Sequence, residues 1–376
     1  MKLKIFILFF ILIIISFIKT LSPNFNIYGD NSDKMYGVNL DCARVYHSPD
    51  YIKKYINDIH NYGGNYILLH LNDNERFGVE SETLGQTVDN ARKVNDIYYN
   101  SKTNLAFLSK NQLLDIINYG YNHRVQVIPE IDVPGHAQSI FKLLSYTKNG
   151  KELVDKVKNS DGYNEMYYQK EETVDFSKKL IHEYLGMLPK NAYFSIGGDE
   201  ISVDNHENEK DVVKYINKMD DYLNYYGLHM MMWNDSFHKS VINKYNKNIL
   251  INYWSLSGEI SDKDEYNNNI RLRATMPELN HAGFKTINCN NYYTYIILDK
   301  SSFTKNSFNT WEKELQRWNP EIWNDEHNKE LDKSKNNIGS AISVWGETNG
   351  QYNDIKTYES FSPFVKIFLN KFKKAS

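Results

Sequence analysis

The sequence predicts an α/β protein built as a single (β/α)8 TIM barrel. Short apolar runs rich in β-branched and aromatic residues alternate with segments of helical length, and this unit recurs about eight times. Polar side chains gather just after these runs, where such a barrel keeps its chemistry. The 376 residues suffice for one large barrel, and no low-complexity linker divides them.

The predicted strands share a β-type composition and lie between turn signals. They are 36–41, 65–71, 124–131, 192–197, 228–233, 249–254, 284–290 and 338–345. The predicted helices are 49–62, 110–119, 175–185, 211–226 and 358–372. A doubly wound parallel sheet is the alternative, but no Gly-x-Gly-x-x-Gly sequence follows the first strand, as its dinucleotide site would require.

Ahead of the barrel, residues 1–22 are predicted to be a signal peptide or an N-terminal anchor. A basic start, Met1-Lys2-Leu3-Lys4, precedes the apolar run 5–18, which is short for a membrane span. No small-x-small cleavage pattern follows, so an uncleaved anchor stays open. We therefore expect a secreted or extracellular protein, attached to a membrane only if this segment is retained, with the barrel at 25–376.

Composition narrows the choice of partners. The net charge is -3, with 44 basic and 47 acidic residues intermixed, which argues against a nucleic-acid partner. Cys42 and Cys289 are expected to be buried small hydrophobic residues, because two isolated cysteines define no disulfide framework. No metal-ligand spacing is visible, so we expect neither a metal nor another cofactor. We also expect a monomer.

The stretch 193–200 is a β-type run that ends in two glycines and two adjacent carboxylates. Neighbouring side chains of a regular strand point to opposite faces, so Asp199 and Glu200 can serve one pocket only if the backbone leaves strand geometry before them. Gly197 and Gly198 permit that change and let a ligand approach the main chain. The alternative is a solvated turn after a strand.

Charged and aromatic side chains follow the ends of the predicted strands. One such residue is a weak signal, because loop ends are polar and a lone Trp is more often core. Their recurrence at one end of a barrel predicts a carbohydrate site, because carboxylates and arginine bind hydroxyls while indole rings cover apolar sugar faces. In chain order the candidates are Arg44, Asp73, His136, Asp199, Glu200, Trp233, Trp254, Tyr295, Trp345 and Glu347.

Seven motifs, in this order and spacing, resemble the β-N-acetylhexosaminidases of glycoside hydrolase family 20. The likeness covers nearly the whole chain after its apolar start. The motifs are GVNLDCAR at 37–44, LHLND at 69–73, PEIDVPGH at 129–136, IGGDE at 196–200, MWND at 232–235, YWS at 253–255 and SVWGE at 343–347.

This resemblance implies a retaining glycosidase that uses the substrate as its own nucleophile. In this family the 2-acetamido oxygen attacks the anomeric carbon, and water opens the resulting oxazolinium. By similarity Glu200 would be the general acid and then the base, and Asp199 would accept the acetamido N–H. The Tyr295 hydroxyl would bond the acetamido oxygen.

The remaining candidates would support the acid or bind the sugar. The resemblance implies that Asp73 and His136 form a relay supporting Glu200. It implies that Arg44 and Glu347 hold ring hydroxyls. The residues expected to wall the acetamido and sugar pocket are Trp233, Trp254 and Trp345.

Two positions depart from the family pattern. Ser195 stands where the family motif usually has histidine, two residues before the glycines. Strand parity puts it on the face of Asp199, so the smaller hydroxyl leaves room or a water in the barrel interior, and we expect reduced or retuned activity. Glu259 stands where closely similar members carry aspartate, which bears on the subsite past Trp254.

The resemblance also implies a substrate, poly-β-1,6-N-acetylglucosamine of biofilm matrix, on which the compact, barrel-only form of the family acts. One alternative is a β-N-acetylglucosaminidase acting on chitin-type or glycan β-1,4 oligomers. Another is a weakly active or non-catalytic sugar-binding barrel, which Ser195 makes conceivable. A diguanylate cyclase also carries Gly-Gly-Asp-Glu, but a Phe usually follows there, whereas Ile201 follows here.

Overall fold

The computed structural model describes residues 34–160, 164–201, 208–258, 263–297, 305–324, 330–346 and 353–373. The predicted signal segment, Glu259 and Glu347 lie outside the described residues. Within the described ranges, no helix has both the length and the apolar composition that a membrane crossing needs.

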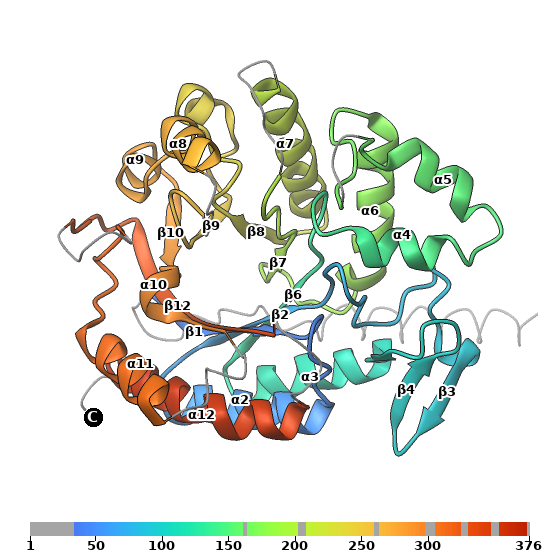
Figure 1. Ribbon diagram of the computed structural model, residues 1–376, viewed down its shortest axis with the longest axis horizontal. Coiled ribbons are helices and arrows are strands. Elements are labelled where there is room, and N and C mark those ends of the chain that lie inside the picture. Colours follow the sequence, from blue (N-terminus) through green and yellow to red (C-terminus); the bar gives the residue numbers. More distant parts are fainter. Residues whose placement is uncertain are drawn as a thin grey trace, which may run out of the picture.

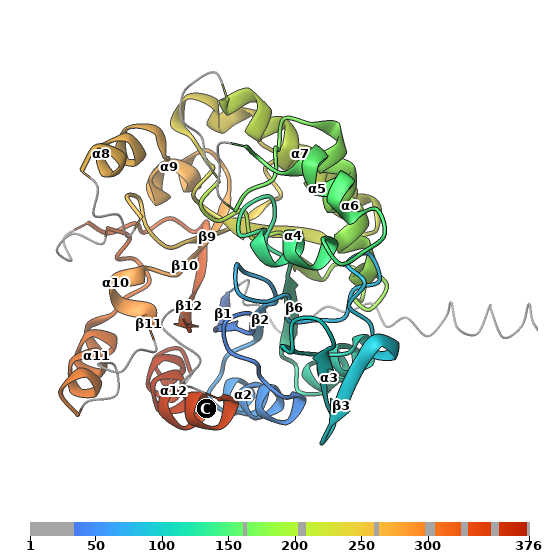
Figure 2. The same cartoon turned by 45° about the vertical axis from the view of Figure 1, so that its right-hand side comes forward.

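Eight parallel strands form a closed barrel, and the predicted TIM barrel is confirmed. Neighbours in the sheet follow chain order, and the last strand pairs with the first through the register Gly37↔Ala341. Helices surround these strands (Figures 1 and 2). The strands are β1 Met35–Asp41, β2 Tyr66–His70, β6 Gln126–Glu130, β7 Tyr193–Ser195, β8 His229–Trp233, β9 Leu250–Tyr253, β10 Lys285–Asn288 and β12 Asn337–Trp345.

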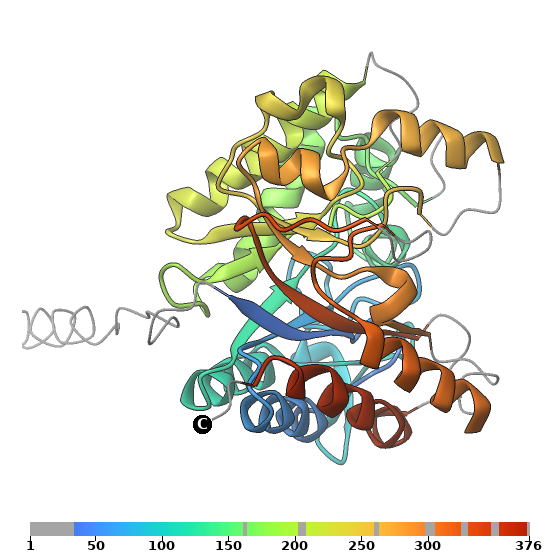
Figure 3. The same cartoon turned by 90° about the vertical axis from the view of Figure 1, so that its left-hand side faces the viewer.

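The predicted helices all form, with ends that shift by a few residues. Two segments far apart in the sequence, α2 and α12, lie side by side on the barrel (Figure 3), with the rings of Tyr55 and Tyr358 5.0 Å apart. The five are α2 Pro49–Asn61, α3 Lys110–Asn122, α6 Glu171–Leu185, α7 Glu209–Tyr225 and α12 Asp354–Asn370. Further helices are α4 Gln138–Leu144, α5 Gly150–Val157, α8 Lys263–Leu272, α9 Met276–His281 and α11 Lys305–Arg317.

The helix α3 illustrates why these segments are helical. The Ser109 hydroxyl accepts a hydrogen bond from the Gln112 N–H, and the Gln112 side chain accepts one from the Ser109 N–H, which satisfies two backbone donors at the helix start. Leu113, Ile116 and Ile117 recur at helical spacing and are buried. The helix therefore has one apolar face, which packs on the barrel.

The barrel interior is partly polar. Alternate residues of the strands point inward, and apolar ones such as Tyr66, Leu68 and Met231 form an inner cluster separate from the larger core between strands and helices. Ser195 and Ser343 are also fully buried. Because these side chains are shielded from bulk solvent, their polar groups need hydrogen-bond partners inside the barrel.

A three-stranded antiparallel sheet was not predicted. It comprises β3 Ala91–Val94, β4 Ile97–Asn100 and β5 Ala106–Phe107, in the connection between β2 and α3 (Figure 1). Asn95 and Asp96, at φ 47° and 64°, form the tight turn between the first two strands. Two consecutive residues with positive φ match the right-handed twist of a hairpin. The Asn95-Asp96 pair was therefore the sequence signal from which this hairpin could have been predicted.

The seventh barrel strand is broken into two pieces. After β10 the chain forms a short helix, α10 Asn291–Thr294, and then a second strand, β11 Tyr295–Ile297. Both β10 and β11 pair in parallel with β12, with Asn288 opposite Ser340 and Tyr295 opposite Ser343. Because the strand is broken, Tyr295 pairs with β12 near the carboxyl end of that strand.

Candidate active site

A cavity of about 340 Å³ opens at the carboxyl ends of the barrel strands. Parallel strands of a closed barrel all end at this face, so side chains from distant parts of the sequence meet here. The lining combines carboxylates, cations and aromatic rings. It consists of Arg44, His70, Asp73, Asn74, His136, Asp199, Glu200, Trp254, Tyr295 and Trp345.

The two glycines after β7 turn the chain so that both acids face this cavity. Gly197 and Gly198 have φ 65° and 69°, and Glu200 itself has φ 50°. A Cβ on Gly197 would lie 2.2 Å from Asp132 Oδ1, so a larger residue does not fit. The Gly198 N–H donates to the same Asp132 oxygen at 2.8 Å. The backbone thus leaves strand geometry where the sequence predicts.

His136 lies between the acid pair and Asp73. Its Nδ1 is 3.2 Å from Asp73 Oδ1, and its Nε2 is 3.6 Å from Glu200 Oε2 and 3.7 Å from Asp199 Oδ2. Burial alone would lower the pKa of His136, but the hydrogen bond and charge of Asp73 outweigh it and raise the pKa to about 9. At neutral pH the site therefore holds a cation beside its two acids.

The pKa values of both acids are raised. Burial raises the pKa of Asp199 well above its ordinary value, and the neighbouring carboxylates of Asp235 and Glu200 raise it further. Burial and Asp235 also raise the pKa of Glu200, against the lowering effect of His136. The Glu200 side chain is 63% exposed, compared with 29% for Asp199, so Glu200 is the acid that a ligand can reach.

Asp73 is a buried carboxylate in the lining of the pocket. Burial would raise its pKa, but hydrogen bonds from His136 and His70 hold it far below the usual range, so Asp73 remains a carboxylate. Arg44 contributes an ion pair, with Nη2 2.8 Å from Asp73 Oδ2. Arg44 is also held by Asp41, whose Oδ2 lies 3.3 Å from Nη1. The guanidinium therefore has a fixed place at the pocket wall.

Aromatic rings also line the cavity. Trp254 and Tyr295 are stacked, with centroids 5.9 Å apart and an interplanar angle of 9°, and Trp345 meets Tyr295 at 5.6 Å and 63°. Trp233 does not line the cavity; it is 2% exposed and packs behind Trp345 at 5.9 Å. A wall of flat rings next to carboxylates suits a sugar, with one apolar face and many hydroxyls.

The fold and motifs of this barrel match one known family. A family model described as "Glycosyl hydrolase family 20, catalytic domain" matches residues 35–359. The chain belongs to glycosyl hydrolase family 20. The predicted family and enzyme class, a glycoside hydrolase, are thereby confirmed.

Related proteins include one of similar length and others that are much longer. The crystal structure of Dispersin B superposes with a TM-score of 0.84 at 31% identity, covering 90% of this chain and 99% of that one. A β-hexosaminidase of Vibrio furnissii is 27% identical over 177 residues, 45% of this chain and 29% of that protein. Lacto-N-biosidase of Bifidobacterium bifidum is 25% identical over 244 residues, 60% of this chain and 20% of that protein. The chain thus spans less than a third of these two relatives.

Several residues of the family 20 site were given no role from the sequence. His70 lines the cavity, and Asp235 accepts a hydrogen bond from the Trp254 indole N–H at 2.7 Å. Arg273 completes this support, with Nη1 2.8 Å from Asp235 Oδ1. His70 and Asp235 stand inside the recognised motifs, so their place in the motifs was the available signal. Arg273 follows α8, outside every motif, and only the fold reveals it.

One group within the site could in principle hold a cation. Asp132, His136 and Asp199 each offer one donor atom, and these atoms lie within 4.8 Å of one another. A metal would have to displace the proton that a pKa of about 9 keeps on His136 at neutral pH.

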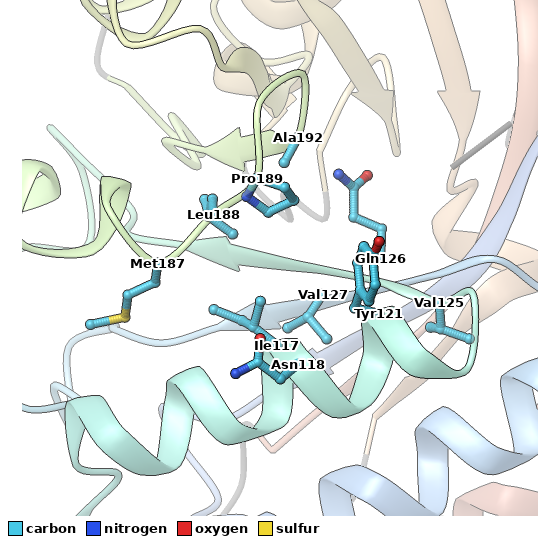
Figure 4. Close-up of a pocket in the computed structure, with 10 residues that line it drawn as sticks. All are labelled: Ile117, Asn118, Tyr121, Val125, Gln126, Val127, Met187, Leu188, Pro189 and Ala192. Atoms are coloured by element: carbon cyan, nitrogen blue, oxygen red, sulfur yellow. The ribbon is translucent and has the colours of Figure 1, made fainter. Parts of the chain in front are cut away.

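A second cavity, of about 230 Å³, lies at the opposite end of the family 20 barrel (Figure 4). Side chains of α3, the start of β6 and the segment before β7 line it, including Tyr121, Gln126 and Pro189. Its ten lining residues include no carboxylate, histidine, lysine or arginine. This cavity therefore offers no carboxylate or imidazole for acid–base chemistry.

Proposed function

We propose that this protein is a retaining β-N-acetylhexosaminidase that uses the acetamido group of its substrate as the nucleophile. The arrangement of the acid pair carries the proposal. Asp199 and Glu200 are adjacent in sequence, yet both face one cavity, with His136 3.7 Å and 3.6 Å from them. Two neighbouring carboxylates on one side of a sugar can serve the acetamido group and the leaving oxygen separately.

In the first step Glu200 gives its proton to the glycosidic oxygen while the acetamido oxygen attacks the anomeric carbon. The bond to the leaving sugar breaks, and the new C–O bond closes an oxazolinium ring. Asp199 accepts the acetamido N–H and stabilises the positive charge that develops on this group. In the second step Glu200 takes a proton from water, whose oxygen attacks the same carbon. The bond from this carbon to the acetamido oxygen breaks, which regenerates the acetamido group and restores the original configuration.

The electrostatics of the site support these roles. A general acid must hold its proton at the working pH, and burial together with Asp235 raises the pKa of Glu200. The stacked rings of Trp254 and Tyr295, with Trp345 beside them, form a wall against which an acetamido methyl group fits. Tyr295 lines the same cavity, and in the proposed mechanism its hydroxyl bonds the acetamido oxygen.

We further propose poly-β-1,6-N-acetylglucosamine of biofilm matrix as the substrate. The similarity to Dispersin B over 99% of that chain supports this choice, because it covers the whole barrel-only form. A β-1,6 link has one more rotatable carbon than a β-1,4 link, so internal sugars reach an open cavity more easily. Glu347 and Glu259, which lie outside the described residues, remain proposed contacts for the ring hydroxyls and the next subsite.

The β-1,4 alternative also has specific support. An N,N'-diacetylchitobiase of Vibrio harveyi is 29% identical over 117 residues, 27% of this chain and 13% of that protein. A direct comparison decides between the two substrates: product release from β-1,6 and β-1,4 oligomers of equal length at equal concentration. We expect faster cleavage of the β-1,6 series. A clear preference for chitin oligomers would refute the biofilm substrate and leave the hexosaminidase proposal intact.

Export of the protein is a separate proposal. It rests on the basic start and apolar run of residues 1–22. N-terminal sequencing of protein recovered from culture medium would test it. Cell-bound protein that begins at Met1 would indicate an uncleaved anchor instead.

We also propose that the protein is a monomer, which size-exclusion chromatography would test.

A further inference from the structure

A line of hydrogen-bonded side chains runs from the barrel interior to the acid pair. The Ser195 hydroxyl donates to Glu130 Oε2 at 2.6 Å, and Glu130 Oε1 lies 2.6 Å from His70 Nδ1. His70 Nε2 is 3.0 Å from Asp73 Oδ2, and Asp73 Oδ1 is 3.2 Å from His136 Nδ1. Because His136 faces the acid pair, five residues connect the core of the barrel to its pocket.

The inner part of this line is closed to water. Ser195 and Glu130 are 0% exposed, Asp73 1% and His70 3%. A buried carboxylate without donors costs several kcal/mol, so the protein itself must supply the partners of Glu130. Ser195 supplies a donor to one oxygen and His70 meets the other. The serine that replaces the usual family histidine is therefore a hydrogen-bond donor to a buried acid, and not an empty space.

His70 is the charged link in the line. Each of its ring nitrogens faces a carboxylate, and a neutral imidazole carries one N–H, so only the imidazolium can donate to both. Burial would lower the pKa of His70, but hydrogen bonds with Asp73 and Glu130 outweigh it and raise the pKa well above its ordinary value. The imidazolium can therefore donate one hydrogen bond to Glu130 and one to Asp73.

Of the two carboxylates that contact His70, Glu130 lies on the side of the barrel interior. The Trp345 ring covers one side of the imidazole, edge-on, at 5.4 Å and 88°. Asp73 lies on the pocket side, where Arg44 also binds it. The charged and titratable groups that act on His70 or on its carboxylate partners are Glu130, Asp73, Arg44, Asp132 and His136.

We propose that Glu130 and Ser195 are positioning residues for the reaction: they hold His70 with an N–H directed at Asp73, and so fix the Asp73–His136 pair against Glu200. The inference rests on the proposed function, in which Glu200 is the acid. Neither residue is among the residues that line the active-site cavity. Both act through His70.

A pH signature follows from this arrangement. Without the charge of Glu130, the pKa of His70 falls toward an ordinary histidine value of about 6.5. Below that pH Nε2 keeps its proton and the line is intact; above it Asp73 loses a donor. In the wild type the raised pKa of His70 postpones this loss to higher pH. The variants should therefore fail selectively as pH rises.

The test compares kcat and KM of Glu130→Gln and Ser195→Ala for an aryl N-acetylglucosaminide between pH 4.5 and 8.5. Ser343→Ala is the matched control, because Ser343 is also fully buried in the barrel and bonds Asn39 at 3.0 Å instead of Glu130. Glu130→Gln should lose about tenfold in kcat for each pH unit above its new pKa, with KM little changed. Ser195→Ala should shift in the same direction by less, and Ser343→Ala should follow the wild type. Profiles of Ser195→Ala and Glu130→Gln that keep the wild-type shape would overturn the proposal.

A second readout does not depend on substrate. Nitrogen NMR of protein labelled in histidine, with His70 assigned by its loss in His70→Gln, reports the protonation of both ring nitrogens. We expect His70 to stay doubly protonated well above pH 6.5 in the wild type and to titrate closer to the ordinary value of about 6.5 in Glu130→Gln. A wild-type His70 that titrates near this value would overturn the positioning role even in an active enzyme. Absence of hexosaminidase activity would refute the proposed function and leave this spectral result to stand by itself.

Discussion

Asp199 and Glu200 differ in their surroundings, although they are neighbours. Asp199 lies deeper, 29% exposed, near the carboxylates of Asp235 and Asp132, whereas Glu200 is 63% exposed toward the cavity. A group that orients a bound acetamide belongs at the inner position, and a group that meets the leaving oxygen and then water belongs at the open one. The assignment of the two roles follows from this difference.

Replacing either acid by its amide should lower the rate by on the order of a thousandfold, because each serves a separate part of one transition state. Glu200→Gln cannot donate the proton, and Asp199→Asn lacks the negative charge that would stabilise the positive charge developing on the acetamido group. The measurement is kcat for an aryl N-acetylglucosaminide, with Glu172→Gln, an exposed residue of α6, as the control. Near-normal turnover by Glu200→Gln would remove it from the mechanism.

His136 should make the stability of the protein depend on alkaline pH. Its pKa is raised to about 9 by Asp73, so its contribution is fully present below the unfolded value of about 6.5 and is lost as pH rises through 9. Thermal unfolding at pH 7 and pH 9.5 measures this. The wild type should lose more stability over this interval than His136→Gln, which should already be less stable at pH 7. An equal loss in both proteins would contradict the ion pair.

Among the elements, local sequence patterns predicted the barrel strands and the main helices. They did not predict the antiparallel sheet or the strand β11. Each strand carries its own apolar, β-type signal, and each predicted helix has one apolar face, so their positions follow from short windows of sequence. The strand β11 is only three residues long, Tyr295–Ile297, and forms because β12 offers an open edge there. Pairing of this kind depends on tertiary context, which a local pattern does not contain.

The turn after β7 yields a prediction about stability. Gly197→Ala places a Cβ at positive φ and against both the carboxylate and the backbone of Asp132, with the nearest atom at 2.2 Å. We expect a loss of about 2–4 kcal/mol in unfolding free energy, measured by denaturant titration, together with lower activity. Gly186→Ala is the control, since nothing lies within 4 Å of its Cβ position and its φ is -67°. Equal stability of both variants would show that the turn tolerates a side chain.

In the whole molecule, barrel closure explains how much of the site could be predicted. Residues as distant as Arg44 and Trp345 share one pocket because parallel strands end at one face, and the motifs marked those ends. Sequence placed Ser195 on the inner face but did not identify its partner. The partner is Glu130, which lies opposite Ser195 on the neighbouring strand. This pairing follows from the register between β6 and β7, which only the assembled sheet determines.

The proposed mechanism requires that the acetamido oxygen of the substrate, and no protein side chain, forms the first new bond to the anomeric carbon. The most direct measurement is the ratio of kcat/KM for an aryl β-N-acetylglucosaminide and its N-trifluoroacetyl analogue with the same leaving group. Fluorine withdraws electrons from that oxygen, so we expect the analogue to react at least about a hundredfold more slowly. Equal rates for the two substrates would mean that a side chain is the nucleophile and would contradict the proposed mechanism.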